Sequence, residues 1–200
     1  MNPSRSFPIL LVLFLITTFR ALTVPAQTAA ATPVLPGAGM EAKLQQIENN
    51  GKGPTPDQTP TVFTEQEVNA YFASGKIDFP VGVKSVSFES QPEVITGKSK
   101  VDFDQLKAGH SSANPLLSVF SGVHTVVVIA HAHAAGGQGY VHVDSVSLDE
   151  VDIPRFVLQM FVEKYLHPKY PEVGLDSRFG LRDRIDTASV GLHTLSVTQK

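Results

Sequence analysis

An alternation of apolar and polar residues in the middle of the chain limits its fold more than any other feature. Between Val83 and Phe103 the sequence pattern has a period of two, because Val86 and Phe88 alternate with polar residues and Ile95, Val101 and Phe103 share one parity. Successive side chains of a strand point to opposite faces. Two further strand-length segments, Val123 to Ala134 and Gly139 to Asp149, are joined by Gly136 to Gln138, where glycine permits the positive φ of a tight turn. The pattern predicts two antiparallel hairpins, the first turning near Gln91 and Pro92.

A capping signal predicts that a helix begins at Thr64. The Thr64 hydroxyl can accept a hydrogen bond from the amide of Glu67, and the Glu67 carboxylate can accept one from the amide of Thr64. Phe63 and Val68 occupy the two positions of a hydrophobic staple around this cap. The helix is expected to end near Ser74.

The segment from Pro154 to Leu166 is apolar nearly all round, because two stripes lie side by side. The first stripe comprises Ile153, Phe156, Val157, Met160, Phe161 and Tyr165, and the second comprises Leu158, Val162 and Leu166. A helix on a flat sheet needs an apolar stripe only about 100° wide, so this helix requires cover on more than one side. It is interpreted either as a core helix throughout or as a core helix that also lines a groove for an acyl chain.

These patterns predict an α+β fold. A strongly curved antiparallel β-sheet of about five to seven strands wraps around the long apolar helix at residues 154–166, with the amphipathic helix at 65–74 packed at one end. Weaker signals predict a short helix from Asn114 to Gly122, a loop from His167 to Asp186 and a single final strand from Ala188 to Thr198.

The N-terminus has the anatomy of a secretory signal. Arg5 precedes an apolar run from Pro8 to Phe19, and Val24 to Ala26 form a cleavage site with small residues. The run is shorter than the ~20 residues that span a bilayer, and Arg20 interrupts it. We therefore expect a signal peptide over residues 1–26 and export to the bacterial periplasm, in preference to an uncleaved membrane anchor.

The remaining chain divides into a leader and one domain. Residues 27–61 are expected to form a flexible leader with a short helix from Met40 to Asn50 and a proline-rich linker, and residues 62–200 a single α+β domain. The chain contains no cysteine, which excludes a disulfide scaffold and a thiol nucleophile. A net charge of −3 argues against a nucleic-acid partner.

The order of these elements resembles that of the LmeA-like phospholipid-binding proteins of bacterial envelopes and, more loosely, of the TULIP-like lipid-binding proteins. The segments that carry the resemblance are TEQEVNAYF at 64–72, residues 79–86, GKSKVDF at 97–103, residues 146–154 and RIDTA at 184–188. It implies a helix wrapped by a curved sheet, with an apolar interior that holds lipid tails. Unlike members fixed to a membrane, this chain has no anchoring cysteine.

The resulting functional hypothesis is a non-enzymatic exported protein that binds or carries a lipid or fatty-acyl ligand, with peripheral contact to a membrane surface. The candidate lining residues are Phe103, Val127, Ile129, Val157, Leu158, Phe161, Val162 and Leu166. Each buried methylene would contribute ~0.8 kcal/mol, which favours recognition of the tail over the headgroup. The alternative is a structural or interaction protein of the envelope in which a partner covers the apolar helix.

A metal site is a third hypothesis. His131 and His133 project from one strand face, and a hairpin that pairs residue 131 with residue 142 brings His142 opposite them. Three imidazoles are the ligand count of a catalytic zinc, and Asp144 lies on the same face as a supporting partner. We favour the simpler interpretation of a solvated strand face.

Catalytic and cofactor motifs are missing from the sequence. It has no GxSxG, no HExxH and no glycine-rich phosphate loop with a lysine. Asp102 and Asp104 share a strand face but have no neighbour that would shift their pKa values apart. The sequence therefore predicts no enzymatic activity and no cofactor.

Overall fold

The computed structural model describes residues 37–108, 121–167, 171 and 173–200. The predicted signal peptide and nearly all of the predicted helix from Asn114 to Gly122 lie outside these residues. Within them, no helix is long and apolar enough to cross a membrane.

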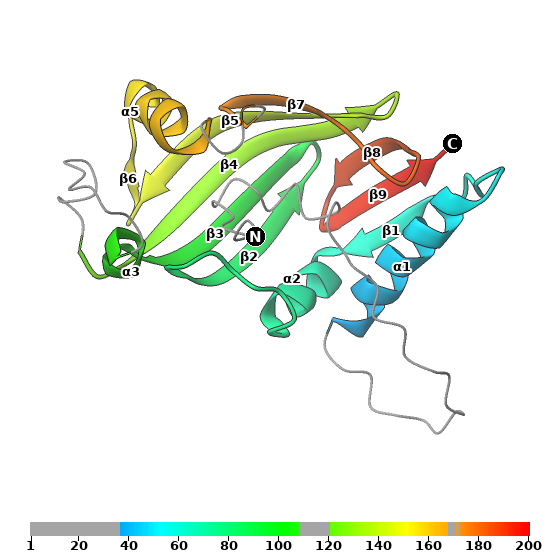
Figure 1. Cartoon of the computed structure of the whole chain (residues 1–200), viewed down its shortest axis with the longest axis horizontal. Helices are drawn as coiled ribbons and strands as arrows, with labels where there is room; N and C mark the ends of the chain where they lie inside the picture. Colours follow the sequence, from blue (N-terminus) through cyan, green and yellow to red (C-terminus); the bar gives the residue numbers. More distant parts are fainter. Residues whose placement is uncertain (1–36, 109–120, 168–170, 172) are drawn as a thin grey trace, which may run out of the picture.

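Nine antiparallel strands and a few short helices make up the described chain (Figure 1). The strands are β1 (Thr61–Thr64), β2 (Val83–Gln91), β3 (Val94–Asp102), β4 (Val123–Ala135), β5 (Gln138–Leu148), β6 (Val151–Asp152), β7 (Asp176–Gly180), β8 (Ile185–Gly191) and β9 (Thr194–Gln199). The helices are α1 (Ala38–Lys52), α2 (Glu65–Ala73), α3 (Phe103–Ala108), α5 (Arg155–Phe161) and the π-helical turn η2 (Val162–Leu166).

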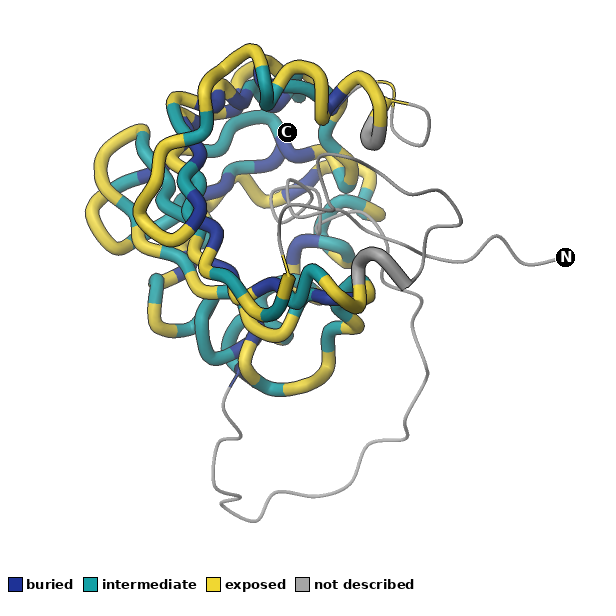
Figure 2. Tube along the Cα trace, turned by 90° about the vertical axis from the view of Figure 1, so that its left-hand side faces the viewer, coloured by how far each residue is buried: buried dark blue, intermediate teal, exposed yellow. Residues whose placement is uncertain are grey.

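The strands form one branched sheet with the order β1-β9-β8-β4-β3-β2. On one edge of β4, β3 pairs with residues 123–131 and β8 with residues 133–134. On the other edge β4 pairs with β5, which also pairs with β6 and β7. In Figure 2 the strands wind around an interior lined by buried residues. The sheet is therefore rolled, with an inner and an outer face.

Both predicted hairpins are confirmed. Strands β2 and β3 are joined through Pro92 and Glu93, and strands β4 and β5 through Gly136 and Gly137. The two glycines have φ values of 60° and 77°, as a two-residue turn with positive φ at both central positions requires. In the first turn Glu93 itself has a φ of 66°.

The predicted long apolar helix, with the sheet wrapped around it, is wrong. The described residues contain a large antiparallel sheet and short helices only, and α5 has seven residues before the turn η2. Figure 1 shows α5 beside the end of β5 and β6 rather than inside the sheet. Phe156 and Met160 are 68% and 51% exposed. The apolar pattern suggested burial on all sides, but folded proteins also leave apolar side chains exposed.

The predicted capping box at the start of α2 is confirmed. The Thr64 hydroxyl accepts a hydrogen bond from the amide of Glu67 at 3.2 Å, and the amide of Thr64 donates to the Glu67 carboxylate at 2.9 Å. Lys43 of α1 donates to the same carboxylate at 2.7 Å. This ion pair ties the two helices together.

Helix α1 packs on the sheet at its C-terminal half. Ile47 is 2% exposed and belongs to a small core with Phe63, Ile185 and Val197. The buried side chain of Gln199 donates to the carbonyl oxygen of Ile47 at 2.8 Å. The helix predicted at Met40 to Asn50 is therefore present, and it forms part of the folded structure.

Two features of the C-terminal region differ from prediction. The predicted final strand is the hairpin of β8 and β9, with Leu192 and His193 at its turn. His193 adopts a φ of 52°, a conformation that sequence patterns do not assign to histidine. The segment predicted as a loop contains β7, which pairs with the outer edge of β5.

Candidate functional site

An apolar cavity of about 180 Å³ lies between helices α1 and α2 and the inner face of the sheet. Its apolar walls comprise Met40 and Leu44 of α1, Val68, Tyr71 and Phe72 of α2, Phe63 of β1, Val86 and Phe88 of β2, Ile95 of β3, Val128 and Ala130 of β4, Val141 of β5, Val190 of β8 and Leu195 of β9. For comparison, an engineered protein cavity of about 150 Å³ with Leu, Ile and Phe walls stays dry and binds benzene. The cavity here thus has room for several methylene groups.

Helix α2 closes the wall of the cavity against the edge of β2. The side-chain amide of Asn69 donates to the carbonyl oxygen of Phe88 at 2.8 Å, and its oxygen accepts from the amide of Phe88 at 2.7 Å. One turn earlier, the Glu65 carboxylate accepts from the amide of Ser90 at 2.8 Å. Two side chains of α2 therefore bond to this edge of β2, which has no paired strand among the described residues.

The two charged residues of the cavity wall are both paired. Glu65 contacts the imidazole Nδ1 of His193 at 2.9 Å, and this hydrogen bond lowers the pKa of the Glu65 carboxyl. Lys98 donates to Glu89 at 2.6 Å from a side chain that is 45% exposed. The described wall therefore has the chemistry of an apolar binding site.

The candidate lining residues of β4 lie on the other face of the strand. Val128 and Ala130 face the cavity, so Val127 and Ile129, one position away, face outward. Ile129 is 37% exposed. Phe103, the first residue of α3, packs against the main hydrophobic core, a buried cluster that includes Val101, Val143 and Leu148, and does not line the cavity.

The candidates on the apolar helix are also absent from the cavity wall. Val162 is buried in the main core, Leu158 packs against this core, and Phe161 is 37% exposed. Val157 lies in α5, and the side chain of Leu166 is outside the described residues.

Sequence reasoning missed the walls supplied by α1 and α2. The sequence predicts the helix from Met40 to Asn50 but assigns it to the leader at 27–61, outside the domain, so Met40 and Leu44 are not among the candidate lining residues. The alternation of Val86 and Phe88 with polar residues, together with the apolar face of Val68 and Phe72, carried a usable signal. The register of β4 could not be inferred because a one-residue shift exchanges the two faces.

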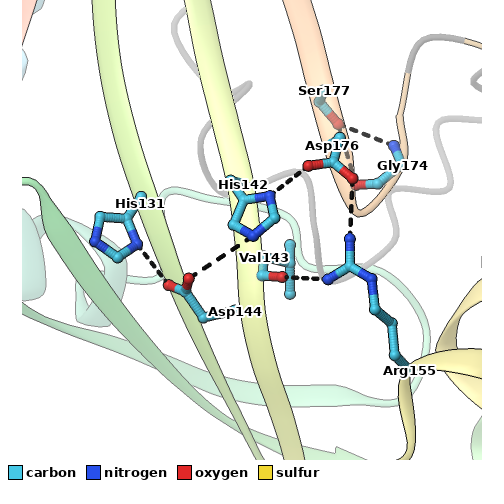
Figure 3. A network of polar contacts seen from close by, with 8 residues as sticks. All are labelled: His131, His142, Val143, Asp144, Arg155, Gly174, Asp176 and Ser177. Atoms are coloured by element: carbon cyan, nitrogen blue, oxygen red, sulfur yellow. Dashed lines mark hydrogen bonds and ion pairs between the residues drawn. The ribbon is translucent and has the colours of Figure 1, made fainter.

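The structure brings two of the three candidate histidines together. His131 and His142 are directly opposite each other in β4 and β5, as predicted. A β-bulge leaves Asp144 as an extra residue of β5, so Asp144 lies beside both rings (Figure 3). Its carboxylate is 2.8 Å from Nδ1 of His131 and 3.9 Å from Nε2 of His142.

A chain of polar contacts continues from these histidines across β7. Nδ1 of His142 contacts the Asp176 carboxylate, which also accepts from the Arg155 guanidinium at 3.0 Å (Figure 3). His133 instead stacks on the ring of Tyr140, with centroids 5.0 Å apart. Among the described residues, no group of three or more histidines and carboxylates is arranged to hold a metal ion. The outer face therefore carries a half-exposed network of hydrogen bonds and ion pairs.

The two candidate carboxylates do not share a strand face, because Asp102 is the last residue of β3 and Asp104 lies in the first turn of α3. Asp102 accepts hydrogen bonds from the amides of Gln105 and Asp104, both at 3.1 Å, and the Gln105 amide lowers the pKa of the Asp102 carboxyl. Asp104 accepts from the amide of Gly122 at 2.8 Å. Asp102 thus caps the start of α3.

The contact between His124 and Asp149 joins β4 to the turn after β5. Their hydrogen bond raises the pKa of His124 and lowers that of Asp149. The stabilisation from His124 is present below the pKa of an unfolded histidine and is lost as the pH rises through its raised folded value. The stabilisation from Asp149 is present above the pKa of an unfolded aspartate, and it is lost as the pH falls through the lowered pKa of Asp149 in the folded state.

We expect a matching pH dependence of thermal stability. The difference in Tm between the native chain and His124→Gln should be largest between about pH 4 and pH 6.5. In this range His124 and Asp149 are charged in both the folded and the unfolded state. Melting curves followed by circular dichroism from pH 3 to pH 9 would measure it. A difference that does not change between pH 5 and pH 9 would contradict this prediction.

No family model, no curated protein and no solved structure matches this chain.

Proposed function

We propose that the protein binds the apolar chain of a lipid in the cavity between α1, α2 and the inner face of the sheet. The observation that supports the proposal is the wall of the cavity, which is apolar apart from a few polar residues and has both of its charged residues paired. Each methylene moved from water into such a site contributes ~0.8 kcal/mol. Binding would therefore depend on the tail, and the headgroup would contribute little.

The volume limits how much of a lipid is enclosed. Ligand sites for drug-sized molecules usually measure about 300–1,000 Å³, and this cavity measures about 180 Å³. We therefore expect it to hold a short chain, or the end of a longer one, with the remainder outside. Together with the predicted signal peptide, this suggests a non-enzymatic lipid-binding protein of the bacterial periplasm or envelope.

A larger side chain that fills part of the cavity should weaken this binding strongly. Ala130 is 4% exposed and lines the cavity, and Ala130→Leu adds three carbons in place of two or three ligand methylenes. At ~0.8 kcal/mol each, their loss weakens binding by about thirty-fold. The folded state should be as stable as before or more stable, because filling a cavity commonly stabilises a protein.

Native mass spectrometry of the chain recovered from a bacterial periplasm without detergent would measure the effect. We expect a mass excess that extracts as lipid from the native chain and is missing from Ala130→Leu. Val127→Leu is the matched control, because it enlarges a side chain on the opposite face of the same strand. A lipid retained equally by all three chains would place binding elsewhere, and an unliganded native chain that takes up nothing from liposomes would refute the proposal.

A second candidate function, binding to a protein partner, is favoured by the surface of α5. Phe156 and Met160 are one helical turn apart and mostly exposed. Neighbouring apolar side chains of this size mark interaction surfaces when they form a patch. The partner would cover the face of α5 that the sheet leaves open.

Site-specific crosslinking in cells tests this second candidate. A photoreactive amino acid at position 156 should give one discrete protein adduct, while the same group at the exposed position Glu89 gives none. Identical patterns from both positions would show that α5 is an ordinary exposed surface.

A further inference from the structure

Ser99 is one of two buried residues of the cavity wall that carry a hydroxyl group. Like Tyr71 it is 5% exposed, whereas the other polar residues of the wall, Glu65, Ser90, Lys98 and Thr194, are half-buried or exposed. Alternation along β3 directs its side chain to the inner face, because the neighbouring Lys98 and Lys100 are exposed. The hydroxyl therefore faces an apolar cavity and has little access to water.

This hydroxyl lacks a good hydrogen-bond acceptor among the described residues. Its single recorded contact is with the carbonyl oxygen of Val126, at 3.5 Å. Hydrogen bonds from hydroxyl groups normally measure about 2.5–3.0 Å. A buried hydroxyl without a partner costs free energy that an alanine or valine at this position would avoid. An acceptor in the ligand would remove that cost.

The surroundings of Ser99 restrict the charge of such an acceptor. Of the two charged wall residues, Glu65 is an anion and Lys98 pairs with Glu89 at the surface. A carboxylate or phosphate enclosed here would lose its hydration without gaining a cation, which is strongly unfavourable. An uncharged oxygen loses far less hydration and needs one donor.

We propose that Ser99 donates a hydrogen bond to an uncharged oxygen of the bound lipid, so that the part of the chain enclosed in the cavity carries a neutral alcohol, ester or ketone group. This assignment rests on the proposed lipid binding and specifies its ligand class. It excludes the fatty-acid anion as the enclosed group. It also distinguishes the natural ligand from a plain hydrocarbon, which has no acceptor for the hydroxyl group of Ser99.

Three probes of equal chain length test the assignment: n-hexane, 1-hexanol and sodium hexanoate at pH 8. Dissociation constants would come from NMR titrations that follow the methyl signals of Ile95 and Val128, which line the cavity. The variant is Ser99→Ala, which removes only the hydroxyl. The control is Ser87→Ala, because Ser87 is exposed on the outer face of the neighbouring strand.

We expect Ser99→Ala to weaken the binding of 1-hexanol by about five- to tenfold, which corresponds to the loss of one neutral hydrogen bond. The affinity for n-hexane should stay the same or rise, hexanoate should bind most weakly to every chain, and Ser87→Ala should change nothing. If Ser99→Ala changed the affinities for 1-hexanol and n-hexane equally, the proposed role of Ser99 would be wrong, and the proposed lipid binding would still stand. Absence of saturable shifts with all three probes in the native chain would overturn the proposed function as well.

Discussion

Gln199→Leu is expected to lower the free energy of unfolding by about 3 kcal/mol. Gln199 is 5% exposed, and its side-chain amide donates to the carbonyl oxygens of Ile47 and Asp183 while its oxygen accepts from Asn50. Leucine has a similar size but can form none of these three hydrogen bonds, and a group that loses its partner in a buried site costs about 1–3 kcal/mol. Urea unfolding followed by circular dichroism would measure the loss.

Gln46→Leu is the matched control for this prediction. Gln46 lies in α1 next to Ile47, but its side chain is exposed, so a change to leucine there should alter stability by no more than about 0.5 kcal/mol. Equal effects from the two variants would show that helix α1 is not held by the contacts of Gln199.

Gly51→Ala should destabilise the fold by about 2 kcal/mol, although alanine is the better helix former. A Cβ atom at position 51 would lie 2.4 Å from the carbonyl oxygen of Asp183 and 2.8 Å from its Cα. These are backbone atoms, so the helix or the turn before β8 must move. Overpacking of this kind costs about 1–3 kcal/mol, which exceeds the gain of up to about 1 kcal/mol in helix propensity.

The control is Gly180→Ala, in β7. An added Cβ there has no atom within 4 Å, and the loss of glycine's backbone freedom should leave stability unchanged or raise it by about 0.5 kcal/mol. Each of the two variants is compared with the native chain by the midpoint of urea unfolding, provided that the m-value does not change. If Gly51→Ala proved as stable as the native chain, the close approach of α1 to the turn at Asp183 would be wrong.

Local chemistry made the hairpins and the start of α2 predictable from sequence. Gly136 and Gly137 permit one turn type, and the pair of Thr64 and Glu67 encodes a cap within four residues. In each case the residues that determine the structure are close in sequence. The opposition of His131 and His142 followed from the same turn, because the turn fixes the register of the strands.

The cavity could not be predicted because distant segments form it. Leu44, Val68 and Leu195 meet only when α1, α2 and β9 have packed together. The turn between β8 and β9 was missed because Leu192 and His193 are not typical turn residues. The apolar segment at 154–166 misled prediction for the opposite reason, since part of its apolar surface remains in water.

If the proposed ligand enters by displacing α2, its entry is linked to the risk of aggregation. Phe88 and Ser90 would expose the backbone groups of an edge strand if Asn69 and Glu65 withdrew. An uncovered edge is a template for pairing with another chain. Any opening of α2 that admits a lipid would therefore also expose a strand to self-association. A bound lipid that keeps α2 closed would act as protection against polymerisation, so delipidated protein should be the form that aggregates.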